Sequence, residues 1–189
     1  MVFMYIAAYI ILFGFFFIEK FLRKGSKDMR KTKFDKNSTN LISTVMGITF
    51  IMLFISPILN HFEIGKIVYY WVGIIGFLVG GIGIVVRCMA FYALGRFFTR
   101  TLQKSENHTL ITNGIYKYIR HPGYLSDILI FLGVGIALLN WIPVVFVVAT
   151  YPATYCYRIK MEERMLIEIF SESYIDYQKD SKKLIPFIY

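Results

Sequence analysis

The segment IVYYWVGIIGFLVGGIGIVV, residues 67–86, runs for twenty positions without a charged side chain. At about 1.5 Å per residue, a helix of this length crosses the ~30 Å hydrocarbon core of a bilayer. Four glycines recur in it at spacings of three and four, so they share one helix face where another backbone can approach closely. The sequence therefore predicts a membrane helix that packs through Gly73, Gly76, Gly80 and Gly83.

Four further apolar runs surround this segment, at residues 2–18, 41–59, 124–139 and 141–157. With 57% hydrophobic residues, 17% charged residues and a mean hydropathy of +0.56, the chain is too apolar for a soluble domain of 189 residues. The last two runs are separated only by Asn140, which predicts a tight helical hairpin. The first run has neither basic residues before it nor a cleavage pattern after it, so we expect a retained helix.

These runs predict an all-α integral membrane protein with five transmembrane helices. After the fifth run, apolar residues keep helical spacing from residue 158 to about residue 179, which predicts a C-terminal cytoplasmic amphipathic helix. The stretch RCMAFYALGRFFTR, residues 87–100, alternates basic and aromatic side chains and predicts a separate helix lying at the membrane interface. We expect a two-helix membrane region with a basic cytoplasmic loop at residues 1–66, and a catalytic membrane core at residues 67–189.

The net charge of +9 comes from basic residues that cluster between the apolar runs. Of the 21 lysines and arginines, all but Lys66 fall within residues 20–36, 87–120 or 158–183. In a five-helix topology these groups share one face, which the positive-inside rule makes cytoplasmic. The chain is therefore predicted to be multi-pass, with its N-terminus outside and its C-terminus and active site cytoplasmic. This clustering indicates membrane lipids as partners and not nucleic acid.

Two polar stretches beside these apolar runs are candidates for chemistry, because polar groups at a membrane are costly and therefore usually functional. The first is HTLITNGIYKYIRHPGY, residues 108–124, whose proline is expected to open the fourth helix. The second is RIKMEERML, residues 158–166, in which Arg158 and Glu162 share a helix face beside Glu163. A surface ion pair worth about 0–1 kcal/mol is the simpler reading, but the position at a membrane exit near His121 favours a site.

No His-x-x-x-His or cysteine cluster suits zinc, so no metal is predicted.

Together these two stretches closely resemble the isoprenylcysteine carboxyl methyltransferase family, integral membrane enzymes that use S-adenosyl-L-methionine. The resemblance starts near Arg87, where the chain looks like the bacterial branch, and covers the rest of the sequence. It implies a methyltransferase that transfers a methyl group to the carboxylate of a lipophilic, prenylcysteine-like substrate. It also implies that Arg158 and Glu162 are catalytic, with Arg158 facing the substrate. The implied cofactor contacts are Gln103, His108, Thr109, Leu110, Ile111, Tyr116, His121, Pro122, Gly123, Tyr124 and Glu162.

The residue types suit this chemistry. The faces of Tyr116 and Tyr124 can attract a sulfonium by cation–π interaction, worth on the order of 0.5–2 kcal/mol, and Glu162 can bind the charged amino acid end of the cofactor. A carboxylate acceptor is already ionised at pH 7 and needs no general base. It needs a cation, and Arg158 can hold it through two hydrogen bonds. Carboxyl methylation is therefore favoured over amine methylation, in which a proton must leave.

Two alternatives stay open at this point. Ser126 and Asp127 stand where animal members of the family have Gly-Trp, and an acid at the mouth of the fourth helix leaves the acceptor undecided. It could be a lipid amine, or a phenolic or enolic hydroxyl of a lipid-like metabolite. An alternative of another class is a non-catalytic membrane scaffold or a small transporter.

Overall fold

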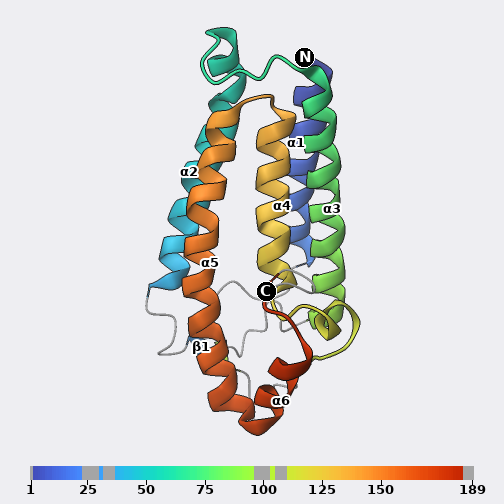
Figure 1. Ribbon diagram of the computed structural model, residues 1–189, viewed down its shortest axis with the longest axis vertical. Helices are drawn as coiled ribbons and strands as arrows, with labels where there is room; N and C mark the ends of the chain where they lie inside the picture. The colour runs from blue at the N-terminus through green and yellow to red at the C-terminus, as the bar shows by residue number, and fades with distance from the viewer. Residues whose placement is uncertain (1, 23–29, 32–36, 96–102, 105–109, 185–189) are drawn as a thin grey trace.

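Five apolar helices run side by side along the length of the molecule in a computed structural model (Figure 1). The structure describes residues 2–22, 30–31, 37–95, 103–104 and 110–184. The helices are α1 (Val2–Phe17), α2 (Ser38–His61), α3 (Tyr70–Leu94), α4 (Pro122–Ala137) and α5 (Trp141–Phe170), and a sixth, α6 (Glu172–Asp180), folds back at the foot of α5. Short elements complete the fold: π-helix η1 (Ile18–Leu22), 3-10 helix η3 (Gly114–Lys117), and strands β1 (Arg30–Lys31) and β2 (Gln103–Lys104), which pair antiparallel.

The predicted all-α membrane architecture is confirmed. Four helical stretches are long and apolar enough to cross a bilayer: Val2–Lys20, Ser38–His61, Tyr70–Leu94 and Trp141–Phe170. The fifth apolar helix, α4, has 16 residues and covers about 24 Å, somewhat less than a typical hydrocarbon core. It stands in the middle of the bundle in Figure 1. At 30 residues, or about 45 Å, α5 extends well beyond a bilayer core at the end that carries α6.

Local sequence signals set the ends of α4 and α5. Pro122 lies in the first turn of α4, where its missing N–H costs nothing. Asn140 caps α5, since its side-chain oxygen accepts a hydrogen bond from the backbone N–H of Ile142 at 3.0 Å. Leu139 takes a positive φ of 55° in the connection. The predicted tight hairpin between these two helices is confirmed.

The glycine face of α3 packs against α4, as the sequence predicts. A Cβ on Gly76 would lie 2.3 Å from the backbone nitrogen of Ala137, and one on Gly83 would lie 2.8 Å from that of Ile130. On the opposite helix, a Cβ on Gly133 would lie 2.2 Å from the backbone nitrogen of Gly80. Distances this short leave no room for a side chain, so glycine is required for the two backbones to approach this closely.

At the basic end, one sequence-based prediction is wrong and another is confirmed only in part. The expected interfacial helix is absent over residues 87–94, because α3 continues unbroken to Leu94 and ends at Gly95, where φ is +53°. The side chain of Arg87 is buried between carboxylates, so it can remain inside the bundle. Residues 96–100 of that prediction lie outside the described part of the chain. The amphipathic helix predicted after residue 158 does continue from the fifth apolar run, but Ser171, with a φ of 49°, ends α5, and α6 completes the segment.

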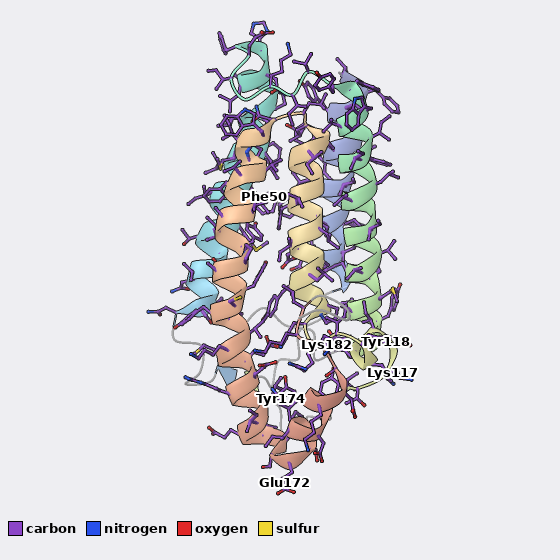
Figure 2. The ribbon with its side chains drawn as sticks, in the orientation of Figure 1. Phe50, Lys117, Tyr118, Glu172, Tyr174 and Lys182 are labelled. Carbon is purple, nitrogen blue, oxygen red and sulfur yellow. The ribbon has the colours of Figure 1, made fainter. Side chains whose placement is uncertain are left out.

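The two ends of the bundle differ in charge. The loop from α2 to α3 meets the α4–α5 connection through a bridge between Lys66 and Asn140. All the other lysines and arginines that the structure describes belong to segments at the opposite end, as the grouping of charges predicts. Helices α1 and α2 share one apolar core with α4 and α5, in which Phe15 and Phe50 both pack on Phe131 with ring centroids 5.3 Å apart. Figure 2 shows Phe50 at mid-height in this core.

Candidate active site

The start of α4 meets the middle of α5 at the basic end of the bundle. The hydroxyl of Tyr124 donates a hydrogen bond to Oε2 of Glu162 at 2.5 Å and accepts one from Nε of Arg158 at 3.1 Å. Nδ1 of His121 lies 3.7 Å from the same Glu162 oxygen. The two polar stretches singled out in the sequence are therefore in direct contact, and one tyrosine hydroxyl joins the acid to the guanidinium.

Arg158 is held from two further directions. Its side chain is 1% exposed, and Nη1 donates to Oγ of Ser38 at 2.6 Å and to Oγ1 of Thr39 at 3.2 Å. Both hydroxyls belong to the first turn of α2, far from Arg158 in the sequence. Sequence reasoning missed them, because a Ser-Thr pair ahead of an apolar run carries no motif beyond a helix start.

Aromatic rings stack behind this hydrogen-bonded group. The ring of Tyr124 lies between those of His121, at a centroid distance of 5.7 Å, and Tyr155, at 4.8 Å, with interplanar angles of 19° and 21°. The sequence reading included His121 and Tyr124 but missed Tyr155, which sits inside an apolar run. Both faces of Tyr124 are therefore covered, and the three nearly parallel rings form a rigid wall beside Glu162.

The 3-10 helix ahead of α4 buries Tyr116 and leaves Tyr118 exposed. The backbone carbonyl of Tyr116 accepts a hydrogen bond from the hydroxyl of Tyr177 at 2.5 Å. Burial raises the pKa of Tyr177 to about 12 and raises the pKa of Tyr116 far above its ordinary value, so both phenols stay neutral. An exposed tyrosine such as Tyr118 suits the headgroup level of a membrane, whereas the buried Tyr116 does not.

Arg120 binds the last turn of α6 and the residue that follows it. Its Nε donates to Oε1 of Glu163 at 2.9 Å, while Nη1 donates to the backbone carbonyls of Gln178, at 3.1 Å, and Ser181. Backbone hydrogen bonds join the same two segments. The N–H of Arg120 donates to the carbonyl of Lys182 at 2.8 Å, and the N–H of Lys182 donates to the carbonyl of Tyr118 at 3.0 Å. Figure 2 shows Tyr118 and Lys182 side by side. Arg120, which directly precedes His121 and Pro122, thus holds the last described residues next to the site.

Replacing Arg120 by glutamine is expected to weaken the attachment of the segment after α6. The substitution removes one partner of a buried ion pair, and such changes typically cost about 3–5 kcal/mol. Hydrogen exchange at the amides of residues 120 and 182 should therefore accelerate about tenfold or more. Lys117→Gln, which removes the same charge from an exposed position nearby, should leave the exchange rates unchanged. Equal rates in both variants would show that Arg120 does not hold the segment.

The other residues implied as cofactor contacts are distributed as follows. Leu110 and Ile111 are half-buried in the segment ahead of η3, while Pro122 and Gly123 form the first turn of α4. His108 and Thr109 lie outside the described residues, and for Gln103 only the backbone is described, in β2. Within the described ranges, no three His, Cys, Asp or Glu side chains are grouped so as to hold a metal ion.

Comparison with known proteins places the chain. The sequence profile of the isoprenylcysteine carboxyl methyltransferase (ICMT) family matches residues 74–168, from α3 to near the end of α5. The protein-S-isoprenylcysteine O-methyltransferase of Xenopus laevis is 33% identical over 120 residues, 62% of this chain and 42% of that protein. The enzyme of that name from Dictyostelium discoideum is 36% identical over 122 residues, 64% of this chain and 50% of that protein.

This chain thus spans about half the length of the curated relatives it matches. A solved structure of the eukaryotic intramembrane Ras methyltransferase ICMT superimposes with a TM-score of 0.66 and 28% sequence identity. The match covers 94% of this chain and 63% of that one, so the likeness extends to helices that the family profile does not reach. The chain belongs to the isoprenylcysteine carboxyl methyltransferase family.

Proposed function

We propose that this protein is a membrane methyltransferase that uses S-adenosyl-L-methionine to methylate the carboxylate of a lipophilic substrate. The names of its relatives give isoprenylcysteine as the group that those enzymes methylate. One observation carries the proposal. The hydroxyl of Tyr124 joins Glu162, the carboxylate implied for the cofactor, to Arg158, the guanidinium implied for the acceptor. The groups needed for the two reactants therefore meet at one aromatic side chain.

The residues present fit the cofactor. When bound, S-adenosyl-L-methionine supplies an electrophilic methyl group on a positively charged sulfur. An outer face of the stack formed by His121, Tyr124 and Tyr155 can attract such a cation, because a π face is electron-rich. Glu162 is half-buried and can accept charge-assisted hydrogen bonds from the ammonium of the cofactor. The remaining cofactor contacts of the proposal come from the family resemblance: Gln103, His108, Thr109, Leu110, Ile111, Tyr116, Pro122 and Gly123.

Arg158 supplies the cation for the acceptor carboxylate. Its burial lowers the local dielectric and strengthens attraction to an anion, while Ser38, Thr39 and Tyr124 fix the orientation of the guanidinium. An ionised carboxylate requires no proton removal at neutral pH. The protein's task is then to align the acceptor oxygen for in-line displacement in a site from which water is excluded.

The arrangement in the membrane follows from the charge distribution. We place the basic end, with the active site and the C-terminus, on the cytoplasmic side, and the N-terminus outside. The cofactor then arrives from the cytoplasm, and the lipophilic acceptor arrives through the bilayer. Residues 67–189 form the catalytic core, while residues 1–66 form the N-terminal membrane region and supply Ser38 and Thr39 to Arg158.

Calorimetric titration of the purified protein with S-adenosylhomocysteine tests the cofactor, and we expect micromolar affinity. Glu162→Gln should weaken that affinity about tenfold or more, because a hydrogen bond to a charged group is lost. Glu172→Gln, the same change at the exposed tip of α6 (Figure 2), should not. Absence of binding by the wild-type protein would favour the scaffold or transporter.

The acceptor is tested with labelled cofactor against acetyl farnesyl cysteine, a phospholipid amine and an alkyl phenol. We expect methylation of the farnesyl cysteine carboxylate. Methylation restricted to the amine or the phenol would move the protein to the alternative acceptor class while leaving the cofactor assignment intact.

A further inference from the structure

A buried charge network lies beside the aromatic stack, in a region to which the sequence reading gave no cofactor role. Nη1 of Arg87, on α3, donates to Oδ1 of Asp127, on α4, at 2.9 Å. Nη2 of Arg87 is paired with Glu19, which follows α1. The other oxygen of Asp127 accepts a hydrogen bond from the hydroxyl of Tyr155, on α5, at 2.8 Å. One carboxylate therefore connects α4 to both α3 and α5.

This network is enclosed by apolar helices. The side chains of Arg87, Glu19 and Asp127 are 5%, 8% and 8% exposed. Charged groups in such surroundings cost several kcal/mol unless they are paired, and they usually mark functional sites in membrane proteins. Packing alone would be satisfied by apolar residues of similar size, so the network requires an explanation beyond cohesion of the bundle.

The network holds the first turn of α4. The carbonyl of Gly123 accepts hydrogen bonds from Nη1 of Arg87, at 3.1 Å, and from Oγ of Ser126, at 2.6 Å. Nη1 of Arg87 also donates to Oγ of Ser126 at 3.3 Å. The backbone of the HPGY turn is therefore fixed relative to α3 by a buried arginine, whose position is in turn set by Asp127.

The network also holds an aromatic ring. The hydrogen bond from Tyr155 to Asp127 anchors the far end of a ring that stacks on Tyr124 at 4.8 Å. A ring tethered at its hydroxyl has less freedom to tilt, so its neighbour is presented in a single orientation. Asp127 thus acts on both the backbone and a ring of the proposed cofactor site, although its own oxygens are engaged by Arg87 and Tyr155.

We infer that Asp127 and Arg87 are positioning residues for the cofactor: they fix the first turn of α4 and the Tyr155–Tyr124 stack in the geometry that S-adenosyl-L-methionine requires. This inference rests on the proposed function. It gives Ser126 and Asp127 a role in shaping the cofactor site, where the sequence alone leaves open an effect on the acceptor. The acceptor carboxylate remains with Arg158.

Two variants test the inference in the 189-residue chain. Asp127→Asn weakens the contact with Arg87, and Tyr155→Phe keeps the ring while removing its tether. We expect the KM for S-adenosyl-L-methionine and the Kd for S-adenosylhomocysteine to rise about fivefold in Tyr155→Phe and about tenfold or more in Asp127→Asn. The relative rates with acetyl farnesyl cysteine, the phospholipid amine and the alkyl phenol should stay as in the wild type.

Tyr151→Phe is the matched control, because it removes a buried hydroxyl one turn earlier on α5 that donates to Thr49 at 3.1 Å. It should change thermal stability without changing the KM for the cofactor. If Tyr155→Phe and Tyr151→Phe behave alike, the network is only structural and the inference fails. It fails also if Asp127→Asn reorders the acceptors with the cofactor KM unchanged.

The experiment distinguishes failure of the proposed function from failure of the inference. A wild-type protein that does not bind S-adenosylhomocysteine overturns the proposed function, and the inference with it. A wild-type protein that binds, with both variants binding equally well, overturns only the inference. Asp127→Asn leaves Arg87 with less compensating charge and could prevent folding. Tyr155→Phe retains the ion pairs of the network, so its affinity for S-adenosylhomocysteine then tests the inference alone.

Discussion

Replacing Arg158 by lysine is expected to lower kcat/KM for the acceptor by about 100-fold or more, which corresponds to about 2.7 kcal/mol of lost transition-state binding. The guanidinium uses Nε for Tyr124 and Nη1 for Ser38 and Thr39. Its planar fork reaches partners in several directions at fixed angles. The three N–H donors of a lysine ammonium all leave one nitrogen, so they cannot reproduce these directions and also hold a carboxylate.

The measurement is methyl transfer from labelled S-adenosyl-L-methionine to acetyl farnesyl cysteine, with a melting curve for each variant in detergent. Affinity for S-adenosylhomocysteine should change far less than kcat/KM for the acceptor, because Arg158 is assigned to the acceptor. Arg164→Lys is the control, since Arg164 lies on the same helix with its side chain exposed. Full activity in Arg158→Lys and also in Arg158→Ala would remove Arg158 from the site.

The helices were the most predictable part of this fold. The apolar run at residues 2–18 became α1, Val2–Phe17, and the run at residues 41–59 became α2, Ser38–His61. A chain in lipid must satisfy its backbone hydrogen bonds internally, so an apolar run of this length has essentially one local solution. The glycine face of α3 was predictable for a related reason, because small residues at helical spacing indicate where a second backbone can approach.

The contacts that orient the site were not predictable in the same way. Ser38 lies 120 positions from Arg158, and Arg87 lies 68 positions from Glu19 and 40 from Asp127. Such pairs depend on how far each helix is shifted and rotated against its neighbours, which no local pattern encodes. One signal was available. Arg87, Glu19 and Asp127 stand at the margins of apolar runs, and a charge in that position needs a partner of opposite sign.

The prediction of an interfacial helix over residues 87–100 was wrong for the same reason: no local pattern shows which side chains of other helices Arg87 will meet. Basic residues interleaved with aromatic ones are typical of a helix on the membrane surface. Arg87 instead finds two buried carboxylates, and α3 continues through this stretch to Leu94. By contrast, RHPGY and the Arg158–Glu163 stretch were recognisable, because each concentrates its polar residues within a few positions.

Replacing Gly133 by alanine is expected to destabilise the bundle by about 3 kcal/mol, the upper end of the usual range for overpacking. The added Cβ would lie 2.2 Å from the backbone nitrogen of Gly80 and 2.6 Å from its Cα. Backbone atoms cannot move aside by changing a rotamer, so α3 and α4 must separate. The apparent melting temperature in detergent should fall by about 6–12 °C for a chain of this size.

Gly81→Ala is the matched control, because it adds the same methyl group on α3 at a position with no atom within 4 Å. Alanine has the higher helix propensity, so its melting temperature should equal or exceed that of the wild type. Separation of the helices also reaches the site, since α3 carries Arg87 and α4 carries Tyr124. Gly133→Ala should therefore weaken S-adenosylhomocysteine binding even at temperatures where the protein remains folded. A variant that melts with the wild type would mean that α3 and α4 are not packed as closely as their glycines require.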